Sequence, residues 1–240
     1  MEKIGLQLCS INDCMVEDFA GSLKKVAEFG YTGVEFAGYG GLSAKEIKKL
    51  LEDNNLEATA AHHGIDTFKN NLEAEIEFAK EVGIGALVLP WVDIRSAEDT
   101  LKLAETLTKV TEKCLENSLP FVYHNHAHEF VKDNDEFLLD ILFQNVPGLL
   151  CELDVYWVEY AGVNVIDYMK KFDKRLPLIH LKELSAEKTN VDIGTGILNF
   201  PLIIETAKAL GTTGFIVEQE RYAENAMVSA KNNVEYLLKL

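Results

Sequence analysis

Three residues that could bind a metal ion each end a short apolar run: Asp154, His180 and Glu218. A carboxylate, an imidazole and a second carboxylate suit a hard or borderline divalent cation such as Mn²⁺, Co²⁺, Zn²⁺ or Fe²⁺. The three residues are far apart in the sequence, so they can bind one ion only if the fold brings the ends of their apolar runs together. We therefore expect a site for one divalent metal ion.

A fourth ligand is expected from the segment YHNHAHE at 123–129. His124 ends an apolar run and Glu129 lies in the loop beyond it, and the sequence leaves both open. We favour Glu129 slightly, because a third carboxylate would neutralise the cation more fully. Glu218 and Glu129 are also candidates for proton transfer, since a carboxylate can bind the ion with one oxygen and face the substrate with the other.

Lys182 follows His180 by two residues, so the alternation of side chains along a strand points both to the same side. Its cation could orient a hydroxyl group or balance an oxyanion in catalysis. A salt bridge to Glu152 or Glu220 is an equally good interpretation. Glu152 could also support His180 or Lys182 from outside the ligand set.

Substrate contacts are expected from four further residues near the ends of apolar runs. Glu35 and His62 end two of these runs, His126 follows another, and Trp157 lies three residues beyond Asp154. An aromatic side chain such as Trp157 could form an apolar wall against a sugar ring, although aromatic residues are more often part of a core.

The elements that must position these residues alternate in type along the chain. Short runs rich in Val, Ile, Leu and Phe predict eight strands, at 4–9, 33–36, 57–62, 86–90, 120–125, 149–154, 178–182 and 215–218. Segments with apolar residues at three- and four-residue spacing predict helices at 16–29, 44–54, 71–82, 97–117, 134–145, 165–172, 200–210 and 223–238.

Eight strand-helix units favour a (β/α)8 TIM barrel over an open doubly wound sheet, because no glycine-rich turn follows the first strand. The polar residues that end the strands of such a barrel converge on one mouth, where the catalytic site lies. The 240 residues, 48% of them hydrophobic, fit one domain over 1–240.

The charge balance bears on partners and location. Lys and Arg total 23 against 39 Asp and Glu, a formal charge of −16, so nucleic acid is a poor partner. No secretory pattern and no run of eighteen uncharged apolar residues is found, so we expect a cytoplasmic protein without a membrane span. The four cysteines lack the paired spacing of a zinc site, and the oligomeric state stays open, a homo-oligomer included.

Several stretches resemble the xylose-isomerase-like family of sugar isomerases and epimerases across nearly the whole chain: GVEF at 33–36, YHNHAHEF at 123–130, CELDVYW at 151–157, IHLKE at 179–183, DIGTGILNFP at 192–201 and IVEQE at 216–220. The resemblance implies a TIM barrel with one metal ion held by carboxylates and a histidine, and it gives ligand positions to Asp154, His180 and Glu218. Many members carry a glutamate before Asn-His at the end of the fifth strand, whereas His124 stands here.

The resemblance implies an isomerase or epimerase that abstracts a proton next to a metal-bound carbonyl of a small sugar, keto-sugar or polyol. An inosose-type dehydratase, a 3-keto-glycoside lyase or hydrolase, and a non-catalytic barrel subunit are the alternatives. The glycine turn at 194–196 could hold a phosphate group as in other barrels. We favour a tight loop without ligand, since the turn contains neither Arg nor Lys.

Overall fold

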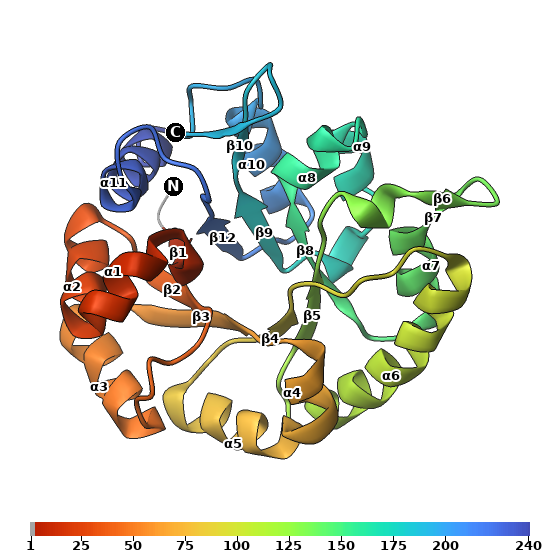
Figure 1. Cartoon of the computed structure of the whole chain (residues 1–240), viewed down its shortest axis with the longest axis horizontal. Coiled ribbons are helices and arrows are strands. Elements are labelled where there is room, and N and C mark those ends of the chain that lie inside the picture. Colours follow the sequence, from red (N-terminus) through yellow and green to blue (C-terminus); the bar gives the residue numbers. More distant parts are fainter. Residues whose placement is uncertain (1–2) are drawn as a thin grey trace.

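The computed structural model describes residues 3–240 and forms a closed barrel of eight parallel strands inside a ring of helices (Figure 1). The barrel strands are β1 Gly5–Gln7, β2 Gly33–Phe36, β3 Glu57–His62, β4 Leu87–Leu89, β5 Phe121–His124, β8 Leu150–Asp154, β9 Leu178–Leu181 and β12 Gly214–Val217. β1 pairs with both β2 and β12, which closes the barrel. The expected TIM barrel is confirmed.

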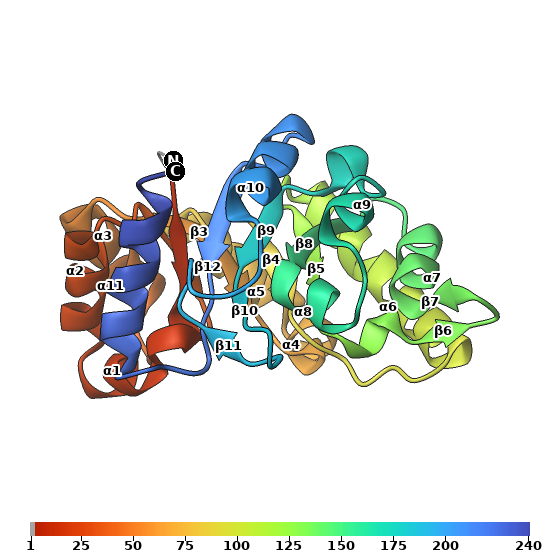
Figure 2. The same ribbon diagram turned by 90° about the horizontal axis from the view of Figure 1, so that it is seen from above.

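The α-helices are α1 Asn12–Glu17, α2 Phe19–Phe29, α3 Ala44–Asn54, α4 Ile65–Asn70, α5 Leu72–Val82, α6 Ala97–Glu116, α7 Leu138–Asn145, α8 Val155–Tyr160, α9 Val165–Met169, α10 Phe200–Ala209 and α11 Ala226–Leu237. Two strand pairs, β6 Lys132–Asp133 with β7 Glu136–Phe137 and β10 Glu183–Leu184 with β11 Asn190–Val191, lie beyond the finishing ends of the barrel strands (Figure 2). None of the helices in residues 3–240 combines the length and apolar character needed to cross a bilayer.

Side chains alternate between two cores along the strands. In β5, Phe121 and Tyr123 pack in the large core between the strands and the helices, whereas Val122 packs inside the barrel with Ala60, Ala86, Val88, Leu178 and Ile216. This inner layer is small and apolar. The next inward positions along β5, β8, β9 and β12 carry polar side chains.

Three expected helices begin later than the sequence pattern indicates, and one of them, expected over 223–238, begins at Ala226 after its cap Asn225. The helix expected over 16–29 is interrupted at Asp18, whose side chain accepts a hydrogen bond from the N–H of Gly21 and caps α2. The helix expected over 134–145 starts only at Leu138, because Asn134 and Asp135 adopt positive φ in the turn between β6 and β7. Short polar side chains tolerate this conformation, and it cannot continue a helix.

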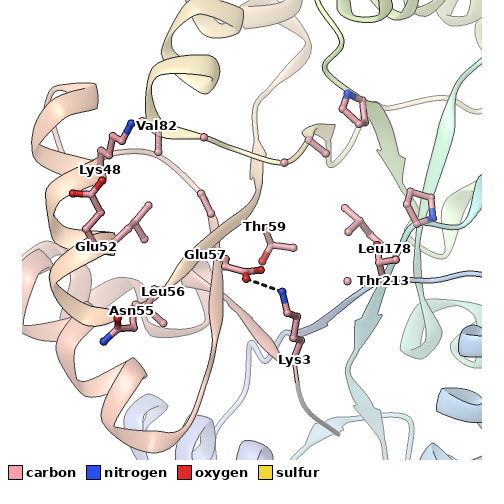
Figure 3. A pocket seen from close by; sticks show the side chains of 18 residues that line it. Lys3, Lys48, Glu52, Asn55, Leu56, Glu57, Thr59, Val82, Leu178 and Thr213 are labelled. Atoms are coloured by element: carbon pink, nitrogen blue, oxygen red, sulfur yellow. Dashed lines mark hydrogen bonds and ion pairs between the residues drawn. The ribbon is translucent and has the colours of Figure 1, made fainter.

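A cavity of about 1180 Å³ opens at the starting ends of the strands (Figure 3). Its wall includes Ala58, Gly85 and Gly214, and the Lys3 amine pairs with Glu57 at 2.7 Å beside it. The polar residues at the finishing ends of the strands lie at the other end of the barrel. The functional site is therefore sought there and not in this cavity.

Candidate functional site

Four buried side chains converge at the finishing ends of the strands: His124 from β5, Asp154 from β8, His180 from β9 and Glu218 directly after β12. One ligand atom from each lies within 4.8 Å of the other three. His124 Nε2 is 3.5 Å from Asp154 Oδ2 and 3.7 Å from Glu218 Oε2. Glu218 Oε2 is 2.6 Å from His180 Nδ1.

The donor set fits a divalent cation. His124 Nε2 and Asp154 Oδ2 are buried and have no hydrogen-bond partner, a state that costs about 1–3 kcal/mol for each group unless something satisfies it. Two imidazole nitrogens and two carboxylate oxygens suit Mn²⁺, Co²⁺, Zn²⁺ or Fe²⁺. The sequence predicts that Asp154, His180 and Glu218 meet in space, and the structure brings these three side chains together.

Neighbouring groups aim the two unpartnered atoms into the cluster. Asp154 Oδ1 accepts hydrogen bonds from the N–H groups of Tyr156 at 2.8 Å and Trp157 at 3.2 Å, which leaves Oδ2 free. His124 Nδ1 lies 3.3 Å from the carbonyl oxygen of Pro90. A proton on Nδ1 would serve that contact and leave the lone pair of Nε2 for a cation.

A second buried cluster contacts the far side of the His180 ring. His180 Nε2 lies 2.7 Å from Glu35 Oε2 and 3.3 Å from Glu152 Oε2, while His62 Nε2 lies 3.1 Å and 2.8 Å from the same two atoms. The side chain of Gln7 donates to Glu35 at 2.9 Å. Glu35 and His62, expected to contact substrate, therefore lie beside His180, a candidate ligand.

Opposite charges outweigh burial in this cluster. Burial disfavours a cation at His62, but the carboxylates of Glu35 and Glu152 raise its pKa to about 10. Burial opposes a charge on His180 as well, but the carboxylates of Glu152 and Glu35 raise its pKa. Burial would raise the pKa of Glu152, yet the two histidines hold it well below its usual range. The His180 ring is thus held between carboxylates at both of its nitrogens, and binding of a metal ion at Nδ1 would require that nitrogen to lose its proton.

Lys182 is fully buried beside the first cluster, next to the end of β9. Its Nζ lies 3.1 Å from Glu220 Oε2 and 3.6 Å from Glu218 Oε1, and it stands over the rings of Tyr156 at 5.2 Å and Trp157 at 5.0 Å. Burial would lower the pKa of Lys182, but the nearby carboxylates, Glu218 first, raise it above its usual value. The side chain is therefore a cation at neutral pH.

The structure does not bring Glu129 to the other candidate ligands, although the sequence favours it slightly as the fourth. Its Oε1 accepts from the Tyr123 hydroxyl at 2.9 Å, and its Oε2 accepts from the His126 N–H at 2.9 Å and lies 3.2 Å from His128 Nδ1. Tyr123 points outward from β5 into the helix layer. The Glu129 carboxylate is bonded to Tyr123 and to the loop, away from the cluster that contains His124.

His126 and Trp157, the other expected substrate contacts, lie side by side with ring centroids 5.2 Å apart. Each has one buried nitrogen without a partner, Nδ1 of His126 and Nε1 of Trp157. Burial lowers the pKa of His126 to about 2, so the ring is neutral. Two residues at the site lay outside the sequence expectations: Gln7 and Cys9, whose thiol lies 3.7 Å from Glu218 Oε1. A polar residue at the end of the first apolar run was the available signal.

Comparison with known families gives one match over most of the chain. The profile of a family described as xylose isomerase-like TIM barrel matches residues 23–240. Among curated proteins, an inosose dehydratase from Clostridium botulinum is 26% identical over an alignment of 219 positions, and the match covers 78% of this chain and 73% of that protein.

Solved structures share the fold over nearly the full length. A sugar phosphate isomerase/epimerase from Parabacteroides distasonis superposes with a TM-score of 0.87 at 22% identity, covering 98% of this chain and 93% of that one. A 3-keto-D-glucoside 4-epimerase from E. coli gives a TM-score of 0.76 at 18% identity and covers 100% of both chains. At these identities the likeness speaks for the barrel alone.

Proposed function

The chain belongs to the xylose isomerase-like TIM barrel family, and on that premise we propose that it is a divalent-metal enzyme that removes a proton next to the carbonyl group of a small keto-sugar or keto-polyol. The observation that carries the proposal is the pair of buried, unpartnered atoms His124 Nε2 and Asp154 Oδ2 beside His180 Nδ1 and Glu218 Oε2. These four atoms are the proposed ligands of one metal ion.

A bound divalent ion would supply Lewis-acid polarisation of a carbonyl oxygen. The protein's own groups then determine where the proton goes. Glu218 is the proposed base, because Oε2 belongs to the ligand set while its other oxygen, Oε1, remains on the side of Lys182 and Cys9. A positioned general base typically accelerates such a step about a hundred- to ten-thousand-fold.

Lys182 is proposed to balance negative charge that develops on the substrate. Its permanent cation, held by Glu218 and Glu220 over the Tyr156 and Trp157 rings, is desolvated and fixed in direction. A fixed charge in a site without water stabilises a developing oxyanion more than a mobile one does. Glu129, bonded through both oxygens, is left out of the proton transfer and is proposed to hold the loop that carries His126.

Three outcomes can follow the loss of the proton, and the same residues serve each. Return of the proton to the neighbouring carbon gives an isomer, and return to the opposite face of the same carbon gives an epimer. Departure of a hydroxide from the next carbon gives dehydration. Isomerisation or epimerisation is the first proposal. Dehydration is the second, and it is favoured by the name of the curated relative, an inosose dehydratase.

The test is a screen in heavy water with Mn²⁺ or Co²⁺, using ketohexoses, inososes and 3-keto-glycosides. We expect deuterium at the carbon next to the carbonyl of a true substrate, detected by NMR. Mass spectrometry then separates dehydration from the other two outcomes, because dehydration removes one water whereas an isomer or epimer keeps all its heavy atoms and gains only deuterium. Glu218→Gln should keep the fold and abolish exchange. Turnover without any deuterium uptake would contradict the proposed proton transfer. If no compound in the screen exchanged a hydrogen, the proposed activity would be rejected.

A further inference from the structure

The loop after β9 stands where many TIM barrels hold a phosphate group. Such sites are commonly built from the loops after the seventh and eighth strands together with the start of a short helix. In this chain β9 and β12 are those strands, and the glycine turn at 194–196 leads to α10. Gly194 adopts a φ of +87°, which turns backbone N–H groups into the loop.

The carboxylate of Glu183 already fills this loop. Glu183 is 1% exposed, and its Oε2 accepts from the N–H of Gly194 at 3.1 Å. Its Oε1 accepts from the N–H groups of Leu198 at 3.1 Å and Leu184 at 3.0 Å. A Cβ atom at Gly196 would lie 2.3 Å from the carbonyl oxygen of Leu184 and 2.5 Å from the Glu183 carboxylate, so both the loop backbone and the carboxylate require glycine there. The donors that could bind a phosphate are occupied by an anion of the chain itself.

Two nearby lysines already face partners within the chain. The buried Lys182 amine is paired with Glu220 at 3.1 Å and lies 3.6 Å from Glu218. Lys188 donates to the carbonyl oxygen of Tyr160 at 3.0 Å. At the start of α10, the side chain of Asn199 accepts from the N–H of Leu202. Arg221, after β12, has an exposed side chain.

Uncharged hydrogen-bonding groups remain available beside the candidate ligands. Nε1 of Trp157 is a buried donor without a partner, and Nδ1 of His126 on the neighbouring ring is likewise unpartnered. Such groups match the hydroxyls of a sugar or polyol, and the indole face matches its C–H surface. A phosphate dianion at this place would meet the carboxylates of Glu218 and Glu220 instead.

We infer that Glu183 is an internal anion that takes the place of a substrate phosphate, so that the site accepts an uncharged keto-sugar or keto-polyol and rejects its phosphate ester. The substrate class rests on the proposed function, whereas the role of Glu183 as occupant of the loop does not. Glu183 is thus a specificity-determining residue that acts by closing an anion site.

The first experiment compares matched pairs in the heavy-water screen: each ketohexose, such as fructose, against its phosphate ester, such as fructose 6-phosphate. For any pair that is turned over, we expect kcat/KM to be about a hundredfold higher for the uncharged compound, because the ester places charge among carboxylates. A higher kcat/KM for the ester would overturn the inference while leaving the proposed metal-dependent proton transfer intact.

The second experiment needs no turnover. Inorganic phosphate is titrated calorimetrically at constant ionic strength into the wild-type protein, Glu183→Ala and the matched control Glu183→Gln, which retains the side-chain volume. We expect binding to Glu183→Ala alone, since only that change empties the backbone donors. Phosphate binding by the wild type, or none by a folded Glu183→Ala, would overturn the inference. If Glu183→Ala does not fold, the wild-type titration decides.

Discussion

His124 Nε2 and Asp154 Oδ2 face each other across 3.5 Å, and both atoms are buried without a hydrogen-bond partner. Folded proteins seldom leave two such atoms together, because each forfeits its interaction with water. A cation between the imidazole nitrogen and the carboxylate oxygen would satisfy both. The pair therefore supports a ligand role for His124 at the position for which the sequence offered two candidates.

Substitution of His124 and of Glu129, the two candidates for the fourth ligand, should separate their roles. We predict that His124→Ala weakens Mn²⁺ affinity by at least about tenfold, because it removes one of four ligands, whereas Glu129→Gln changes it little. Isothermal titration calorimetry of both variants measures this difference. The reverse order of affinities would return the ligand role to Glu129.

Glu35 is expected to support the metal site through His180 without touching the ion. Its Oε2 lies 2.7 Å from His180 Nε2, on the ring edge opposite the candidate ligand atom Nδ1. We predict that Glu35→Gln lowers metal affinity about 10- to 100-fold, the usual effect of losing such a partner. The control is Glu57→Gln, at an exposed pair with Lys3. Equal affinities in the two variants would argue against this coupling.

His63 should make stability depend on pH. Glu75 Oε2 lies 3.2 Å from its Nε2 and would favour a charged ring, but burial and then the neighbouring His62 cation outweigh it and lower the pKa of His63 to about 4. The unfolded chain, with an ordinary histidine pKa near 6.5, then binds a proton first as the pH falls. The full stability is present above about pH 6.5 and declines toward pH 4.

We predict that the metal-free wild type loses roughly 2 kcal/mol more than His63→Gln between pH 7 and pH 5, since the glutamine cannot be protonated. Urea unfolding at both pH values measures the two losses. Parallel losses in the two proteins would show that His63 is not responsible.

The barrel could be predicted because its strands are short apolar runs between helical segments, and because strands ending in Asp154, His180 and Glu218 must finish at the same end of a parallel barrel. Their convergence required no knowledge of side-chain packing. The departures came from local backbone conformation, as at Asn134 and Asp135, where a turn with positive φ delays the start of α7.

The finer assignment of roles depended on how deep each side chain lies inside the barrel, which cannot be read from the sequence. Asp154 is level with His180 in the strand register, whereas Glu152 is level with Leu178, two residues earlier. That offset places Glu152 with Glu35 and His62 on the far edge of the His180 ring. The choice between His124 and Glu129 likewise depended on Tyr123, which points outward and holds the Glu129 carboxylate.

The central claim is that these residues hold one divalent ion, and elemental analysis after equilibration with Mn²⁺ or Co²⁺ and removal of free metal tests it most directly. We predict one ion per chain for the wild type and for Glu129→Gln, a raised melting temperature when the metal is added, and no retained ion in Asp154→Asn. Wild-type protein without metal, whose melting temperature is unchanged by either ion, would contradict the claim.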